Sequence, residues 1–528
     1  MFRGRNRGPQ QPKIPPTPAP TAQPAFTQRQ QPPAAVPPRQ PDTRTYAAPT
    51  MQAPPPPLRV ITSDGRTIVC HHDPFNAGSE GRLFFTLDQA KVVKVYNRPE
   101  PWRRASLETI ISKRHAVLGD NSEYWSHYFC WPEALLTSPS LGMMMPRARK
   151  NLRPFSHLLS PRFRKRISAE SGPAALGTWI GHVGILIKLA RTVNRLHANG
   201  LCHSDLSTNN LLVDPVNGEA TLIDCDGLVE TGSKTLLPTV LGTPDYMAPE
   251  LVEGMTLTTR PAPQPSVNTD LHSLAILIYQ GLLFRHPLRG GAFHSADPDE
   301  DERLMLGKKA LFIEHPSNRT NRPKAAYLSS AILGADMQAL FAKAFIDGLH
   351  DPSKRPLAAQ WERTLVRMYD QTVPCSNPAC EAKSFVLVEG GGARCPWCRT
   401  ELKGPRQIPV LTFYRPDGKQ NSSTFTPDFR LVAWPRRKLN VWHIELNKLP
   451  GPGVNAAPLA EISWTPDVRG QERWTLINTA IPQIYDATGG KNPLPIPQGQ
   501  AIELKEATRL YFGGGERARV VEVHMLTI

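Results

Sequence analysis

The stretch His203-Ser-Asp-Leu-Ser-Thr-Asn-Asn210 decides how this sequence is interpreted, together with two segments that follow it. The first is Leu222-Ile-Asp-Cys-Asp-Gly227, and the second is Gly242-Thr-Pro-Asp-Tyr-Met-Ala-Pro-Glu250. An acidic residue in any one of these segments would, on its own, more often be a turn or helix-cap residue. Three such segments in this order and at this spacing indicate a single functional unit instead.

The order of the three segments resembles the catalytic loop, the metal-binding loop and the substrate-side element of protein kinases. Transfer of a γ-phosphoryl group needs metal-held phosphates, an in-line hydroxyl and an acceptor for its proton. By this resemblance Asp205 orients the substrate hydroxyl and accepts its proton, whereas Asn210 and Asp224 hold Mg²⁺. We therefore expect an α+β, two-lobed protein-kinase-like fold.

A nucleotide-binding half should precede these segments. Asn76-Ala-Gly-Ser-Glu-Gly81 resembles the glycine-rich loop that closes over phosphates, although Asn76 stands where the first glycine would be. In the strand-like run KVVKVY, Lys94 occupies the place of the lysine that reaches the α- and β-phosphates; Lys91 is the weaker alternative, because only Lys94 is followed by Val-Tyr. The resemblance makes Glu108, in ASLETIISKRHAVL, the carboxylate partner of this lysine.

The expected catalytic residues are therefore Lys94, Asp205, Asn210 and Asp224. The expected ATP- and Mg²⁺-binding residues are Gly78, Ser79, Glu80, Gly81, Lys94, Glu108, Asn210, Asp224 and Asp226. Whether Asp224 or Asp226 is the main metal ligand stays open, and the spacing favours Asp224. Downstream, the resemblance makes Asp270 the buried brace of the catalytic loop and pairs Arg355 with Glu250.

Departures from the common kinase pattern point to a subfamily. Ser204 replaces the arginine before the catalytic aspartate, Ser207 replaces the usual lysine, and Asp-Cys-Asp-Gly replaces Asp-Phe-Gly. With its WPEALL and GMMMP segments, these departures and a cysteine module right after the kinase-like region, the chain resembles a bacterial subfamily. Its members are Ser/Thr kinases encoded beside a von Willebrand A-domain protein and a PP2C-type phosphatase in tellurium-resistance-like clusters. The resemblance implies a von Willebrand A-domain protein among the protein substrates and the phosphatase as antagonist.

Four cysteines follow the kinase-like region as Cys375-x4-Cys380-x14-Cys395-x2-Cys398. Paired thiolates on two short loops can enclose Zn²⁺ tetrahedrally, and four protein ligands leave no open position for catalysis. The alternative is four unconnected thiols. We expect a structural zinc ribbon.

Composition divides the chain into five parts. Residues 1–57 hold 17 of the 55 prolines and a net charge of 7 − 1 = +6, which predicts a disordered leader. The kinase lobes follow at 58–145 and 146–370, the ribbon at 371–404, and a β-sandwich-like domain, predicted from runs such as VLTFY and RWTLIN, at 405–528. Its late strands faintly resemble forkhead-associated domains, but we find no arginine and serine pair for a phosphate.

The function expected from the sequence is an ATP- and Mg²⁺-dependent protein serine/threonine kinase. The alternatives are a nucleotide-binding pseudokinase or adaptor, a small-molecule phosphotransferase, and a nucleic-acid-binding protein suggested by the net charge of +16. We do not expect nucleic acid binding, because basic and aromatic residues are not interleaved. No apolar run approaches the length of a membrane span, so we expect a cytoplasmic protein without membrane contact.

Overall fold

The computed structural model of this chain describes residues 55–232, 242–254, 263–388, 390–417, 424–466, 471–490, 492–513 and 519–528. The expectation of a disordered leader concerns residues 1–57 and falls almost entirely outside this part of the chain.

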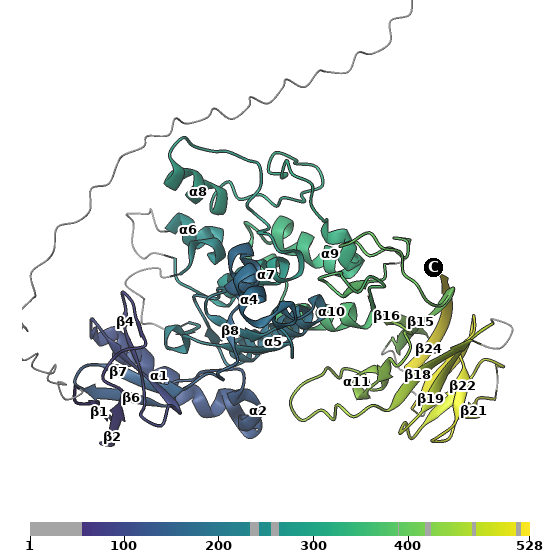
Figure 1. The fold of residues 1–528 in the computed structure, drawn as a ribbon, viewed down its shortest axis with the longest axis horizontal. Coiled ribbons are helices and arrows are strands. Elements are labelled where there is room, and N and C mark those ends of the chain that lie inside the picture. Colours follow the sequence, from purple (N-terminus) through teal and green to yellow (C-terminus); the bar gives the residue numbers. More distant parts are fainter. Residues whose placement is uncertain are drawn as a thin grey trace, which may run out of the picture. The chain divides into compact units, whose positions relative to one another are not determined.

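The first lobe is a seven-stranded antiparallel sheet in the order β2-β1-β6-β7-β5-β4-β3. Figure 1 shows this lobe in purple and blue, with α1 beside the sheet. Its strands are β1 (Leu58–Thr62), β2 (Thr67–Cys70), β3 (Asn76–Ala77), β4 (Gly81–Phe85), β5 (Lys91–Tyr96), β6 (Ala134–Ser138) and β7 (Gly142–Pro146). β5 is buried along nearly all its length, because Val93 and Val95 pack on one face of the sheet and Val92 and Tyr96 on the other. The strand expected from the run KVVKVY is confirmed as β5.

Helix α1 (Pro101–Leu118) covers the second face of this sheet through Leu107. A proline at the first helical position is favourable, because its missing N–H would have no partner there. The short helix α2 (Ser122–Ser126) follows α1 before the chain returns to the sheet at β6.

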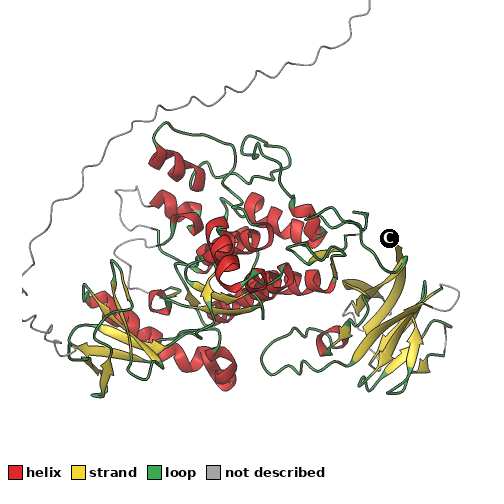
Figure 2. Ribbon diagram, in the orientation of Figure 1, coloured by secondary structure: helices red, strands yellow, loops and turns green. Residues whose placement is uncertain are grey.

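The second lobe is mainly helical, as Figure 2 shows by colour. Its helices are α3 (Ser156–Leu159), α4 (Pro161–Ser171), α5 (Trp179–Ala198), α6 (Pro249–Gly254), α7 (Val267–Leu283), α8 (Pro298–Leu306), α9 (Ala335–Ala342) and α10 (Ala358–Asp370). Short strands lie between them: β8 (Arg153–Pro154), β9 (Leu201–Cys202), β10 (Leu211–Asp214), β11 (Glu219–Leu222) and β12 (Val229–Glu230). A sheet lobe followed by a helical lobe confirms the expected α+β kinase-like fold.

Helices α5 and α7 form the centre of the helical lobe. Thr178 caps α5 by accepting a hydrogen bond from the Gly181 N–H, and Ser266 and Thr269 form a reciprocal capping box on α7. Both helices contribute leucine, isoleucine and valine to the largest apolar cluster of the described residues. In contrast to the expectation from the sequence, one segment, Pro173–Ala198, has the length and hydropathy of a membrane span. The apolar residues of α5 within it are part of this cluster.

The C-terminal region begins with the strand pair β13 (Thr372–Pro374) and β14 (Ser384–Val386). Two antiparallel sheets follow, one in the order β16-β15-β24-β23-β20-β21 and the other in the order β17-β18-β19-β22. Their bounds are β15 (Gln407–Pro416), β16 (Phe425–Val432), β17 (Lys438–Leu439), β18 (Ala460–Pro466), β19 (Glu472–Asn478), β20 (Ile484–Asp486), β21 (Leu494–Pro495), β22 (Ala501–Glu503), β23 (Arg509–Phe512) and β24 (Arg519–Thr527). One helical turn, α11 (Val441–Ile444), interrupts the strands.

Both sheets contribute to one apolar cluster, which contains Leu411 and Phe413 from the first sheet and Ile462 and Leu476 from the second. Alternate residues of β19 point inward, with Trp474, Leu476 and Asn478 buried. Two sheets that share one core form a β-sandwich. The all-β character expected for the C-terminal domain is therefore confirmed.

Candidate active site

The loop that carries Asp205 lies between β9 and β10, and hydrogen bonds to α7 hold it in position. Asp270 of α7 is 1% exposed and accepts hydrogen bonds from the backbone N–H groups of His203, at 2.7 Å, and Ser204, at 3.2 Å. A side-chain carboxylate that accepts two backbone N–H bonds fixes the path of the loop. The prediction that Asp270 braces the catalytic loop is confirmed.

Asp205 is held by groups on both of its carboxylate oxygens. Oδ1 accepts hydrogen bonds from the backbone N–H and the hydroxyl of Thr243, at 2.8 and 2.9 Å, and Oδ2 accepts one from Asn210 Nδ2 at 2.9 Å. Thr243 belongs to the Gly-Thr-Pro segment, so the substrate-side element and the catalytic loop meet at this carboxylate. The sequence did not single out Thr243, and its distance of 38 residues from Asp205 in the chain explains why.

Asn210 and Asp224 lie on neighbouring chain segments, because the Ile223 N–H donates to the Asn210 carbonyl at 2.9 Å. Asn210 uses its amide nitrogen for Asp205, which leaves its amide oxygen as the atom available to a cation. Asp224 has left-handed backbone angles (φ 62°, ψ 36°), and its side chain remains 39% exposed. A carboxylate and an amide oxygen at this place suit Mg²⁺, which prefers oxygen ligands.

Lys94 lies at the centre of a group of carboxylates. Its Nζ is 2.7 Å from Asp226, 3.1 Å from Asp224 and 3.2 Å from Glu80, and its side chain is 9% exposed. Burial alone would lower the pKa of Lys94, but the negative charges of Asp226 and Asp224 outweigh burial and raise this pKa. Lys91, the weaker alternative, instead pairs with Glu133 at 2.6 Å.

Asp226 is the most deeply buried of these carboxylates, with a side chain that is 2% exposed. Besides Lys94, it accepts a hydrogen bond from the Tyr96 hydroxyl at 2.5 Å. Burial would raise the pKa of Asp226, but the positive charge of Lys94 lowers it. Burial and the charge of Asp226 raise the pKa of Asp224. Asp226 therefore pairs with the lysine inside the protein, whereas the more exposed Asp224 remains available to a metal ion.

Glu108 requires a correction, because the structure does not place it beside Lys94. Its side chain is 59% exposed and pairs with Arg104 at 3.6 Å along α1. Leu107 and Ile110 are the residues of this helical turn that face the core. Successive helical residues are about 100° apart, so the position after Leu107 is turned toward solvent. Asp226 is the buried carboxylate that pairs with Lys94, which is the role that the sequence assigned to Glu108.

The glycine-rich segment connects β3 to β4 as a tight turn, in which the Gly78 N–H donates to the Gly81 carbonyl at 2.9 Å. A Cβ atom at Gly81 would lie 2.6 Å from the Val95 carbonyl oxygen, so this position requires glycine. The Asn97 side chain donates to the carbonyls of Gly78 and Ser79. Glu80 points to Lys94 and also lies 3.7 Å from Arg103 of α1, a cation that the sequence did not single out.

The predicted pair of Arg355 and Glu250 is confirmed. Two parallel hydrogen bonds of 2.7 and 2.8 Å join the guanidinium to the carboxylate, and the Arg355 side chain is 1% exposed. This bidentate geometry anchors α6, which starts with the Pro-Glu of the substrate-side element.

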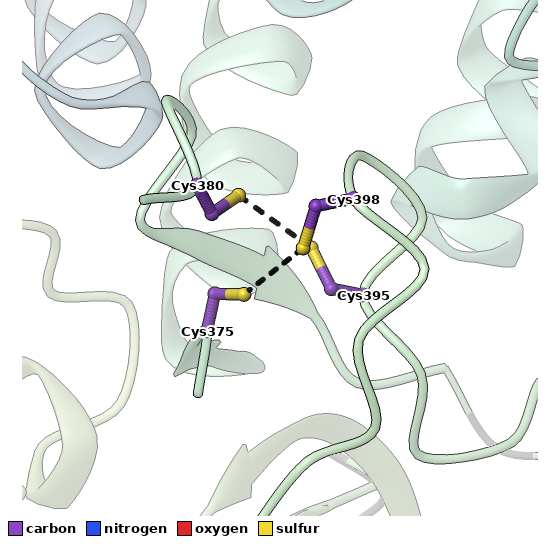
Figure 3. Close-up of side chains that lie close together, drawn as sticks. All are labelled: Cys375, Cys380, Cys395 and Cys398. Atoms are coloured by element: carbon purple, nitrogen blue, oxygen red, sulfur yellow. Dashed lines mark hydrogen bonds between the residues drawn. The ribbon is translucent and has the colours of Figure 1, made fainter. Parts of the chain in front are cut away.

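The four cysteines of the ribbon converge as expected (Figure 3). All four sulfur atoms lie within 4.8 Å of one another, with Sγ–Sγ distances of 3.5 Å for Cys375 and Cys398 and 3.9 Å for Cys380 and Cys395. A Zn–S bond of about 2.3 Å in a tetrahedron puts its sulfur atoms about 3.8 Å apart. The arrangement therefore fits a zinc ion, with Cys380 and Cys395 buried and the other two partly exposed.

Comparison with known proteins agrees with this geometry. Residues 182–361 match the protein kinase domain family. The serine/threonine-protein kinase PkaB of Streptomyces coelicolor is 30% identical over 118 residues, which are 21% of this chain and 26% of PkaB. The serine/threonine-protein kinase PknD of Chlamydia felis is 31% identical over 134 residues, 22% of this chain and 13% of that protein. The chain thus spans about a quarter or less of these relatives.

Among solved structures, a rhoptry kinase from Toxoplasma gondii is similar at 17% identity, with a TM-score of 0.40 over 59% of this chain and 82% of the other.

Proposed function

We propose that this chain is an ATP- and Mg²⁺-dependent protein serine/threonine kinase. The observation that carries the proposal is the convergence of Lys94, Asp205, Asn210 and Asp224 in one site, on a chain whose helical lobe matches the protein kinase domain family. The similarity to serine/threonine-protein kinases of Streptomyces and Chlamydia supports serine and threonine as the acceptor residues.

The reaction assigns a separate task to each residue. Lys94 binds the α- and β-phosphates of ATP through the ammonium group that Asp226 holds in place. Asn210 and Asp224 would hold Mg²⁺, which when bound neutralises the negative charge of the phosphates. Asp205 orients the hydroxyl of the substrate and accepts its proton. The hydroxyl oxygen forms a bond to the γ-phosphorus, the bond from that phosphorus to the bridging β-γ oxygen breaks, and ADP leaves with the electron pair.

The substrate-side segment supports a protein acceptor rather than a small molecule. Thr243 contacts the catalytic carboxylate directly, and Tyr246 bonds to Thr208 of the catalytic loop at 3.0 Å. Gly242–Glu250 is therefore attached to the site where the acceptor hydroxyl must enter. Small-molecule phosphotransferases of related fold generally lack such a platform.

The test is to incubate the purified chain with γ-labelled ATP, Mg²⁺ and generic protein substrates. We expect label in phosphoserine and phosphothreonine after acid hydrolysis. A chain that binds ATP but labels neither itself nor any substrate would instead be a pseudokinase.

We also propose a structural zinc ion at Cys375, Cys380, Cys395 and Cys398. The sulfur spacing supports it, and the ladder between β13 and β14 is only three residues long. Metal analysis of freshly purified protein should return one zinc per chain, and a zinc-free preparation that keeps these residues ordered would contradict the proposal.

For partners, we propose a von Willebrand A-domain protein as substrate and a PP2C-type phosphatase as antagonist. The support for both partners is the resemblance to the bacterial subfamily. That resemblance is carried by Ser204, by the Asp-Cys-Asp-Gly variant and by the cysteine module that follows the kinase lobe in the sequence. Genes for both proteins beside this one, and loss of label when the phosphatase is added, would support the assignment. Absence of both genes would remove its basis.

A further inference from the structure

A cavity of about 580 Å³ lies between the helical lobe and the C-terminal β-sandwich, apart from the catalytic residues. Its walls come from α5 and α10 on one side, and from residues 434–438 and α11 on the other. The volume is within the range of about 300–1,000 Å³ that small-molecule sites occupy, and such sites are common where two domains meet.

Positive charge dominates the lining of this cavity. Arg436 and Lys438 are exposed, and their side chains have no acidic or hydrogen-bonding partner among the described residues. In the described part of the chain, Arg437 donates to two backbone carbonyls, those of Thr372 and Tyr369, and to no carboxylate. The acidic Asp370 in the wall is already bonded to His443 at 3.3 Å.

A buried donor in the wall lacks an acceptor. Arg191 of α5 is 8% exposed, and it uses Nε for Glu362 and Nη1 for the Tyr124 hydroxyl, both at 2.7 Å. Its Nη2 atom is buried and donates to nothing in the described part of the chain. A buried donor without an acceptor is costly, so an anion that reaches this atom would gain binding free energy.

The cavity also offers aromatic surface. Trp434 and Trp442 line it, and both are only partly buried. Within the described residues, neither indole N–H donates a hydrogen bond to a protein acceptor. Tryptophan faces bind flat aromatic rings and bases with little dependence on their identity.

We propose that this cavity binds a small aromatic phosphate of the nucleotide class, with the phosphate at the cations and the base against the tryptophans. The proline-rich leader does not suit the site, because its net charge of +6 would be repelled by the same cations. A phosphate without a ring would leave the tryptophan surface unused. This inference does not depend on the proposed kinase activity.

The test titrates the full chain, without Mg²⁺, with each of the four ribonucleoside 5′-monophosphates and with inorganic phosphate, by calorimetry and tryptophan fluorescence. We expect at least one nucleotide to bind at one site per chain and to change the tryptophan emission. Inorganic phosphate should bind at least about fivefold more weakly, because stacking of a base contributes at least that factor.

Matched variants locate the site. Arg436→Ala with Lys438→Ala should weaken nucleotide binding at least tenfold, since both side chains are exposed and their loss does not disturb the core. Arg473→Ala with Lys505→Ala removes two cations of the same domain, 64% and 67% exposed and paired with Glu503, and should leave binding unchanged. Trp434→Leu should weaken binding of the nucleotide but not of inorganic phosphate.

Three results would overturn the proposal. In the first, no nucleotide binds at about 1 mM, which is weaker than a specific small-molecule site should be. In the second, Lys94→Ala abolishes binding while the Arg436 and Lys438 double variant does not, which places the nucleotide in the catalytic site. In the third, only a phosphorylated peptide binds, which makes the cavity a docking site for a phosphoprotein.

Discussion

The catalytic loop and the cysteine module are both short loops that carry reactive side chains, but different forces hold them. The catalytic loop rests on the largest apolar cluster and is fixed by carboxylates such as Asp270 and Asp205, which bond to backbone groups on either side. The cysteine module pairs two strands of three residues, and its four thiols face one another. Protein packing and hydrogen bonds hold the first loop, whereas we propose that a metal ion adds to the packing that holds the second.

The largest effect should follow from removing the metal. Structural zinc sites contribute roughly 10–16 kcal/mol of binding free energy in zinc-finger peptides. Chelation, or Cys395→Ser, should therefore remove hydrogen-exchange protection from residues 372–402 while α5 keeps its protection. Cys70→Ser is the control, because this buried cysteine lies in the first lobe, in another apolar cluster than α5 and apart from the four ribbon cysteines.

Equal loss of protection in α5 and in the module after chelation would show that the two regions fold as one unit, and the contrast between them would be lost. Cys380 and Cys395 also belong to the apolar cluster of the β-sandwich, so we expect the sandwich to lose some thermal stability as well.

The second prediction concerns the ion pair between Lys94 and Asp226. Loss of one partner of a buried ion pair costs about 3–5 kcal/mol of folding free energy, because the other charge is stranded. Asp226→Asn should cost about 3 kcal/mol of folding free energy, the lower end of this range, because Lys94 keeps its ion pairs with Asp224 and Glu80. The same substitution should weaken ATP binding at least tenfold. Urea denaturation and ATP titration measure the two effects.

Glu108→Gln is the matched control for this pair. Its exposed contact with Arg104 is an i,i+4 pair, for which about 0.3–0.5 kcal/mol is typical. If Glu108→Gln reduced ATP binding more than Asp226→Asn, the lysine would have a different partner during function.

The sequence predicted local structure well where one segment contained the whole signal. The strand-like run KVVKVY predicted β5, which runs from Lys91 to Tyr96. The order of the three kinase-like segments likewise predicted that Asp205, Asn210 and Asp224 lie together.

What the sequence did not predict depends on packing between distant segments. The choice of Asp226 over Glu108 depends on how α1 is rotated against the sheet, and Leu107 and Ile110 decide that rotation only once the core exists. Thr243 and Arg103 reach the site from other elements. The cationic cavity requires α5 and α10 to meet a loop more than two hundred residues after α5, which no local pattern reveals.

A third prediction concerns acid stability of the helical lobe. His286 is 8% exposed; its Nδ1 accepts a hydrogen bond from the Leu288 N–H, and its Nε2 faces the Asp245 carbonyl. Burial lowers the pKa of His286 to about 4, below the ordinary value of 6.5. Between pH 4 and pH 6.5 the unfolded chain therefore binds more protons than the folded chain. The contribution of neutral, buried His286 to the free energy of unfolding is fully present above pH 6.5 and is lost progressively as the pH falls toward 4.

Over that interval His286 should account for about 1.4 kcal/mol of unfolding free energy per pH unit. Denaturation at several pH values should show that the free energy of unfolding changes less steeply with pH in His286→Gln than in the unmodified chain. Identical slopes would mean that His286 is not kept neutral by burial.

The smallest effect should come from Thr243. Its hydroxyl donates one of two hydrogen bonds to Asp205 Oδ1, and the backbone N–H donates the other. Thr243→Val removes only the hydroxyl bond, so we expect kcat to fall about five- to tenfold, or about 1–1.4 kcal/mol. Thr243→Ser keeps the hydroxyl and should stay within about twofold; a similar loss in both variants would show that the methyl group matters instead.

The central claim is that Asp205 accepts the proton of the substrate hydroxyl in a phosphoryl transfer that uses Lys94, Asn210 and Asp224. The direct test measures single-turnover transfer from γ-labelled ATP, and ATP affinity on the same samples, for the unmodified chain and for Asp205→Asn. General acid–base groups contribute roughly 10²–10⁴ in rate, so Asp205→Asn should lose at least a hundredfold in transfer with ATP affinity unchanged. Transfer by Asp205→Asn at the rate of the unmodified chain would contradict the account.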